Sequence, residues 1–221
     1  MSLSLIPEIK AWVQKKKGGH AKHAEYLVER IRGDHLQPGV IADLGCGTMT
    51  VTRRIAELLG DVEVYGYDVK DHAAKRDDDP ANLRYSVIEP FTFGQQEPKA
   101  DIVNLGGVIH HVDQKDELRF LQDVHAGMTD GPDSRLFMHE HTLSANPWRR
   151  RMETVCLRTV EFLINEAAES MLTQYNFYTR ERLLALLDRA GFEVLDHEDV
   201  GTRLVTLPSL NTNTVYWCRK K

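Results

Sequence analysis

Short apolar runs alternate with helical stretches along the middle of the chain, and this alternation is the feature that most limits its fold. Apolar runs typical of strands lie at Val40–Leu44, Val62–Val69, Leu83–Ile88, Ala100–Leu105 and Arg135–His139. Helical patterns lie at Val51–Leu59 and Asp116–Met128, and Asp71–Asn82 fits a helix or a loop. Strands that alternate with helices predict a parallel sheet with helices on both faces.

The two ends of the chain differ from this middle part. A helix is expected over Ile9–Arg32 and a long helical stretch, of one or two helices, over Pro147–Leu172. Thr179 then begins a helix that ends at Ala190, before two strands at Phe192–Val200 and Thr214–Cys218. This closing pair predicts an antiparallel edge. The predicted fold is therefore α/β: a doubly wound, mostly parallel sheet with an antiparallel edge strand, an N-terminal helix and a helical lid.

Composition excludes several other classes of protein. The 221 residues carry a net charge of -5, which does not favour nucleic acid as a general partner. No apolar run approaches the roughly 20 residues that span a membrane, and the basic cluster Lys15–Lys17 follows the apolar start instead of preceding it, unlike a secretory signal. We therefore expect a cytoplasmic protein with no membrane partner. The three cysteines form no CxxC pair, so neither a disulfide framework nor a metal site is expected.

A glycine-rich turn follows the first predicted strand and indicates a nucleotide site. Gly45 and Gly47 would let the backbone pass close to a ligand at the carboxyl end of that strand. The carboxylate of Asp43 would repel a pyrophosphate but suits a ligand with a cationic amino group. Asp68 ends the second strand, where a carboxylate accepts ribose hydroxyls. Together these residues favour S-adenosylmethionine (SAM) over a dinucleotide.

Five segments resemble class I, Rossmann-like, SAM-dependent methyltransferases. They are "ADLGCGT", "VYGYDV", "ADIVNLGGVIHHV", "MTDGPDSRLFMHEH" and "FYTRERLLALLDRAGFEVL". Met49 departs from the family pattern, because it occupies the third glycine position of the first motif. The resemblance implies a seven-stranded sheet in the order 3-2-1-4-5-7-6, with SAM as cofactor and S-adenosylhomocysteine (SAH) as product.

The resemblance also implies which residues hold the cofactor. The segment Ile88–Phe91 would lie against the adenine, with Glu89 bonding its amino group, and Asn104–Gly107 would run beside the methionyl part. The expected cofactor residues are Asp43, Gly45, Cys46, Gly47, Asp68, Val69, Ile88, Glu89, Asn104 and Leu105. We expect one domain over residues 1–221, made of a helical cap (1–38), a SAM-binding core (39–145), a lid (146–178) and a C-terminal helix with strands (179–221).

Histidines near the ends of two strands are candidates for proton transfer. Many acceptors lose a proton during methyl transfer, and histidine suits this task near neutral pH. The expected catalytic residues are His110, His111, Glu140 and His141. A metal held by His139 and His141 is the disfavoured alternative, because no third ligand has suggestive spacing.

Aromatic side chains near these strand ends are candidates for the acceptor pocket. The expected substrate-binding residues are Trp12, Tyr26, Trp148, Tyr175 and Tyr178, and His20 and His23 share the N-terminal helix with two of them. Aromatic residues at helical spacing are equally typical of a core.

The function that these features favour is transfer of a methyl group to an oxygen or nitrogen of a small molecule. One alternative is an RNA methyltransferase that acts at a cap or a terminal phosphate, with Arg149–Arg151 and Lys15–Lys17 on its phosphates. Another is a SAM-binding module without catalysis. The sequence leaves the acceptor, the methylated atom and the oligomeric state open, a homodimer being one option.

Overall fold

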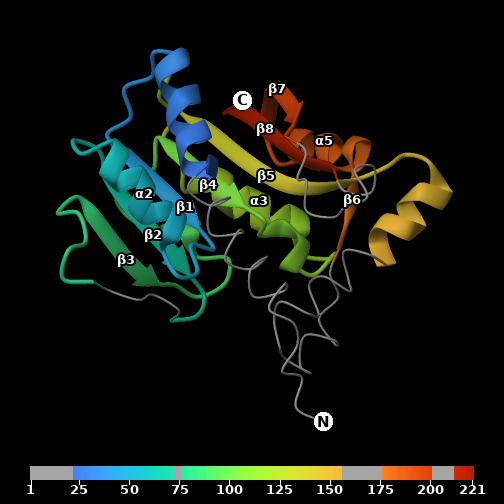
Figure 1. Ribbon diagram of the computed structural model, residues 1–221, viewed down its shortest axis with the longest axis horizontal. Coiled ribbons are helices and arrows are strands. Elements are labelled where there is room, and N and C mark those ends of the chain that lie inside the picture. The colour runs from blue at the N-terminus through green and yellow to red at the C-terminus, as the bar shows by residue number, and fades with distance from the viewer. Residues whose placement is uncertain (1–21, 72–75, 156–175, 201–211) are drawn as a thin grey trace, which may run out of the picture.

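A computed structural model of the chain describes residues 22–71, 76–155, 176–200 and 212–221, and it contains one mixed sheet between two layers of helices (Figure 1). The strands are β1 (Val40–Leu44), β2 (Glu63–Asp68), β3 (Leu83–Val87), β4 (Ile102–Gly106), β5 (Arg135–Leu143), β6 (Tyr178–Thr179), β7 (Phe192–Asp199) and β8 (Thr212–Lys220). The helices are α2 (Thr50–Leu58), α3 (Glu117–Ala126), α5 (Arg180–Arg189) and two at residues 22–33 and 147–155, with short 3-10 turns at Phe93–Gln95 and Ile109–His111.

The strand order confirms the predicted topology. Seven strands follow the path β3-β2-β1-β4-β5-β8-β7, and the two-residue strand β6 pairs with β5 off this path. Strands β1 to β5 pair in parallel, whereas β8 is antiparallel to both of its neighbours. The antiparallel pair expected at one edge is therefore β7 and β8, with β8 on the inner side.

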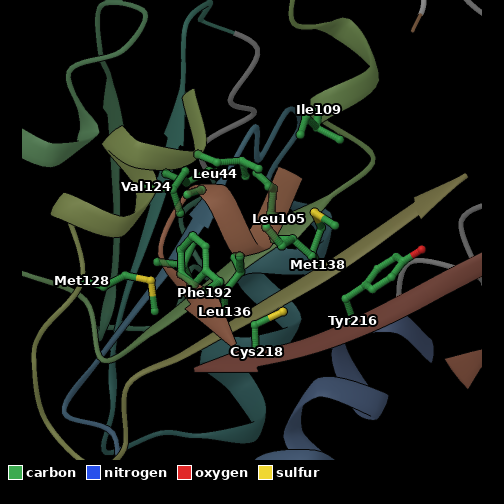
Figure 2. Close-up of a cluster of buried hydrophobic side chains, with 14 of the residues drawn as sticks. Leu44, Leu105, Ile109, Val124, Met128, Leu136, Met138, Phe192, Tyr216 and Cys218 are labelled. Carbon is green, nitrogen blue, oxygen red and sulfur yellow. The ribbon is translucent and has the colours of Figure 1, made fainter. Parts of the chain in front are cut away.

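Each face of the sheet has its own hydrophobic core. On one face, α3 and α5 bury leucine and valine side chains against Leu105, Leu136, Met138 and their neighbours (Figure 2). On the other face, Ala24, Leu27 and Ile31 of the N-terminal helix pack with Ile55 of α2. These helical residues recur at three- and four-residue spacing, which places them on one face of their helix. The alternation of apolar runs and helices thus gives the three-layer architecture that the sequence predicted.

Strand β5 is longer than the sequence indicated. We expected it to end at His139, but it continues to Leu143 and pairs with β8 from Arg135 to Thr142. The apolar pattern stops at His139, and hydrogen bonds to β8 supply the order beyond that point. His139, Glu140 and His141 therefore lie inside a strand and alternate between its two faces.

Two expected helices are described only in part. The N-terminal helix is described from residue 22 and the helix after β5 up to residue 155, so the remainder of Ile9–Arg32 and of Pro147–Leu172 lies outside the described residues. Thr179 caps α5 as predicted, since its side-chain oxygen accepts a hydrogen bond from the Arg182 amide. Within the described ranges, no helix combines the length and apolar character that crossing a bilayer requires.

Candidate active site

The glycine-rich turn connects β1 to α2 at the carboxyl end of the sheet. Gly45 and Gly47 have φ angles of 70° and 51°, which side chains disfavour. The amides of Gly45 and Cys46 donate to the Tyr67 carbonyl of β2 at 2.8 and 3.1 Å. A Cβ atom on Gly45 would lie 2.5 Å from Cγ2 of Val108, whereas one on Gly47 would meet nothing within 4 Å. The turn is therefore packed below at Gly45 and open at Gly47.

Asp68 ends β2 beside this turn. One of its carboxylate oxygens accepts a hydrogen bond from the Gly47 amide at 2.8 Å, and the other accepts one from the Lys70 amide at 3.1 Å. The next side chain, Val69, is 54% exposed. A partly exposed carboxylate can receive a ribose hydroxyl, the role expected for Asp68 from the sequence, and Val69, expected among the cofactor residues, presents apolar surface next to it.

Asp43 lies beneath the turn and is 3% exposed. Its two oxygens accept hydrogen bonds from the Thr52 hydroxyl of α2 and from Nδ2 of Asn104 on β4, both at 2.6 Å. Burial raises the pKa of Asp43 to about 6, and the charge of Asp68 adds to this, although the two hydrogen bonds oppose it. The turn thus has a carboxylate below it that burial makes costly to ionise.

A chain of buried and part-buried hydrogen bonds extends from Asp43 to the N-terminal helix. Oδ1 of Asn104 lies 2.8 Å from Nε2 of His23, and Nδ1 of His23 lies 3.2 Å from Nδ1 of His139 on β5. Burial and the neighbouring His23 lower the pKa of His139 to about 3, so its ring is neutral. This chain links the central strands β1, β4 and β5 to the helix at residues 22–33.

A second polar cluster lies on β5 and on the short turn after β4. Nδ1 of His110 lies 2.7 Å from Oε1 of Glu140, which also accepts a hydrogen bond from the His141 amide at 2.7 Å. His110 and Glu140 are 3% and 2% exposed. Burial alone would raise the pKa of Glu140, but His110 and His141 lower it to about 2. The carboxylate is therefore ionised and holds His110 in one orientation.

The other expected catalytic and cofactor residues surround these two clusters. The ring of His111 is exposed and its centroid lies 4.1 Å from that of His110. Cys46 is buried, and burial raises the pKa of its thiol. Leu105 is fully buried in the core, so its backbone is the part that can face a cofactor. Ile88 is half-buried and Glu89 is exposed.

Three of the expected substrate residues lie in the described parts of the chain, and their surroundings differ. Tyr178 is fully buried and its hydroxyl donates to Glu117, so the position is part of the core and not of an open pocket. The hydroxyl of Tyr26 donates to Glu198 at 2.6 Å, and Trp148 is 80% exposed on the helix at 147–155. Trp12 and Tyr175 lie outside the described residues.

Sequence reasoning missed part of the polar network. Thr52 was read only as a helical residue, and His23 was considered only as a possible pocket residue, whereas both belong to the hydrogen-bonded chain around Asp43. Thr52 lies nine residues after Asp43, on the first turns of α2, and that spacing is a usable signal. No local signal pairs His23 with Asn104, which lies 81 residues away. In the described parts of the chain, no three His, Cys, Asp or Glu side chains are arranged to hold a metal ion.

Comparison with known proteins finds a similarity to methyltransferases over part of the sequence and in the fold. Residues 42–132 match a family model described as a methyltransferase domain. No curated protein sequence matches the chain. The chain is similar in structure to magnesium protoporphyrin IX methyltransferase from Synechocystis PCC 6803, solved with bound SAH, with a TM-score of 0.65 at 14% identity over 99% of this chain and 90% of that one.

Two further solved structures share the fold. They are the mitomycin 7-O-methyltransferase MmcR, with a TM-score of 0.58 at 15% identity over 83% of this chain, and N,N-8-amino-8-demethyl-D-riboflavin dimethyltransferase from Streptomyces davawensis, with a TM-score of 0.59 at 18% identity over 98% of this chain. The chain spans 49% of the length of the first and 60% of the second.

Proposed function

We propose that the chain is a class I, Rossmann-like methyltransferase and that it transfers a methyl group from SAM to an oxygen or nitrogen of a small molecule. The observation that carries the proposal is the group at the carboxyl ends of β1 and β2. There the open backbone at Gly47, the partly exposed Asp68 and the buried Asp43 lie together. These are the positions at which open α/β sheets bind ligands.

The residues of this group fit SAM. The absence of a side chain at Gly47 leaves space over the turn, and Asp68 has acceptor capacity for ribose hydroxyls. Asp43 is a buried carboxylate whose ionisation is unfavourable without a cation nearby, and SAM carries an ammonium group and a sulfonium. Phosphate would be repelled by both carboxylates, which argues against a dinucleotide at the same place.

The cofactor residues that we propose are those named from the sequence, with two refinements. Asp43 acts by its charge from beneath the turn, because both of its oxygens already accept hydrogen bonds. Leu105 acts through its backbone. Val69 and Ile88 supply apolar surface, and Glu89 remains the acceptor proposed for the adenine amino group.

We assign proton removal to His110. When bound, SAM supplies a methyl group on a sulfonium, which leaves readily, so the protein must orient the acceptor and take its proton. Ionised Glu140 accepts from Nδ1 of His110, which keeps the proton at Nδ1 and leaves Nε2 as the basic nitrogen. Glu140 is a positioning residue in this scheme, and His111 and His141 shape the surroundings of His110.

A small-molecule acceptor is favoured by the charge of the chain and by its structural neighbours. The net charge of -5 opposes a polyanion. The neighbours are named for methylation of mitomycin, of a magnesium porphyrin and of a riboflavin derivative. All three names describe small molecules, with O- and N-methylation both represented.

The test is transfer of label from methyl-labelled SAM to a cell extract separated into small molecules, RNA and protein. Asp68→Ala serves as the blank, and calorimetry with SAM and SAH measures binding separately. Label in the small-molecule fraction that is absent with the blank supports the proposal and identifies the acceptor by mass. Label in RNA overturns the choice of acceptor, and a wild-type protein that binds neither SAM nor SAH overturns the proposal itself.

A further inference from the structure

The hydrogen-bonded chain that ends at Asp43 has a defined direction. An ionised carboxylate only accepts hydrogen bonds, so the Asn104 group that faces Asp43 must be the Nδ2 donor. The other end of the amide, Oδ1, then accepts, and Nε2 of His23 must carry a proton. With this proton on Nε2, Nδ1 of His23 accepts in the tautomer that we expect, and Nδ1 of His139 is then the donor. Each group therefore fixes the role of the next.

The site is built closely around the imidazole of His23. A Cβ atom on Gly106, the last residue of β4, would lie 3.3 Å from Cε1 of His23. The edge of the ring packs on Phe137 with centroids 5.2 Å apart. Ala24 and Leu27, which follow His23 on the helix, are fully buried and hold this face of the helix against the sheet. His23 is thus held at the end of β4, beside the segment proposed to border the methionyl part of SAM.

We propose that His23 is a positioning residue for SAM binding, which orients the Asn104 amide so that it donates to Asp43 and keeps this carboxylate ionised for the cation of the cofactor. The inference rests on the proposed function, because it takes Asp43 as the charge that attracts SAM. It adds a residue of the N-terminal helix to the SAM site without any direct contact with the cofactor.

The charges around Asp43 explain why the orientation of one amide matters. Asp43 faces the Thr52 hydroxyl from α2, the Asn104 amide from β4 and the negative charge of Asp68 from β2. Thr52 and Asn104 favour the ionised form, whereas burial and Asp68 disfavour it. If the amide turned over, its Oδ1 would face the carboxylate and stabilise only the protonated form. The proton on Nε2 of His23 excludes that arrangement, since it needs Oδ1 as its acceptor.

Three variants separate this role from simple packing. His23→Leu removes the donor, His23→Gln keeps an N–H donor near the position of Nε2, and Arg30→Gln is the matched control. Arg30 lies on the same helix and forms an ion pair with Asp196 of β7 at 3.0 Å, so its loss weakens the docking of the helix without touching Asn104.

The measurement is the dissociation constant of SAM and of SAH by calorimetry across about pH 5.5 to 8.5, alongside chemical unfolding. With His23→Leu we expect the affinity for SAM at neutral pH to fall about tenfold, the size of one lost hydrogen bond. Affinity also declines at low pH as Asp43 becomes protonated, and we expect the midpoint of this decline to lie at a higher pH in the variant. His23→Gln and Arg30→Gln should retain both the affinity and this pH midpoint. Equal losses of SAM affinity in His23→Leu and His23→Gln, or an unchanged pH midpoint in His23→Leu, would overturn the inference.

A second readout needs no ligand. In full-length protein labelled with ¹⁵N-histidine, long-range ¹⁵N–¹H spectra report which ring nitrogen carries the proton. We expect His23 to be protonated at Nε2 and His139 at Nδ1, and the opposite assignment overturns the inference even where SAM binds. Failure of the wild type to bind SAM and SAH, with the expected tautomers present, would instead count against the proposed function.

Discussion

Replacing Asp43 by asparagine should stabilise the protein and impair its binding of SAM. The two hydrogen bonds to this position can persist after the change. The oxygen of the introduced amide can accept from Asn104, and its nitrogen can donate to the Thr52 hydroxyl, which is able to accept. The substitution therefore removes a buried negative charge while Thr52 and Asn104 each keep a hydrogen bond to residue 43.

The size of the effect follows from the pKa of Asp43, which burial raises from 3.8 to about 6. Each pKa unit corresponds to about 1.36 kcal/mol, so ionised Asp43 costs the folded state about 3 kcal/mol. Because the folded pKa is the higher one, the folded protein binds more protons between about pH 4 and pH 6. The destabilisation by Asp43 is therefore absent below this pH window and complete above it. About half of the 3 kcal/mol is added between pH 5 and pH 8.

The assay is urea unfolding of wild type and Asp43→Asn at pH 5 and pH 8, with Asp61→Asn as the exposed control. We expect the stability advantage of Asp43→Asn to grow by about 1–2 kcal/mol between these pH values, and Asp61→Asn to stay within about 0.5 kcal/mol of wild type. SAM affinity of Asp43→Asn should fall by at least tenfold. A variant that is less stable than wild type at pH 8, or an advantage that does not grow with pH, would refute the reasoning.

Three other changes test separate parts of the site. Glu140→Gln should lower the free energy of unfolding by about 2–3 kcal/mol at pH 7, because the pKa of Glu140 in the folded protein is lowered to about 2. The stability that ionised Glu140 contributes is present above about pH 4.5 and declines below it. Urea unfolding should therefore show a smaller difference between wild type and variant at pH 4 than at pH 7. Gly45→Ala should destabilise the protein by about 2–4 kcal/mol and Gly47→Ala by about 1–2 kcal/mol, since both strain the backbone but only the first adds a clash with Val108. In thermal unfolding, a second change, Val108→Ala, should recover stability for Gly45→Ala but not for Gly47→Ala. Iodoacetamide should label Cys218 far more slowly in native protein than in urea, because burial raises its pKa and blocks access; equal rates followed by mass spectrometry would contradict this.

The sequence predicted the sheet better than it predicted the polar network. Apolar runs and their spacing were enough for the strands, because burial on both faces leaves a strong pattern. The order of the strands came from the family resemblance, since periodicity within a run says nothing about its neighbours. The extension of β5 beyond His139 was missed because its stabilising partner, β8, lies more than 70 residues later.

The candidate site shows the same division. Asp43, Gly45 and Gly47 sit on one local motif, and local spacing was sufficient to find them. The chain from Asp43 through Asn104 to His23 depends on contacts between elements that are distant in sequence, and no local pattern pairs Asn104 with His23. Tyr178 shows a further limit, because an aromatic residue has the same sequence signature in a core as in a pocket, and only the structure shows that this side chain is fully buried.

The place of β8 in the sheet has a consequence for the order in which the protein can be completed during synthesis. β8 is made after β7 but lies between β5 and β7, so both strands have an unpaired edge until residues 212–220 leave the ribosome. Tyr216 and Trp217 then enter the two opposite cores, and both close in the same event. A nascent chain paused before residue 212 would expose two templates for edge-to-edge association, so this stage is where we expect the growing chain to depend most on chaperones.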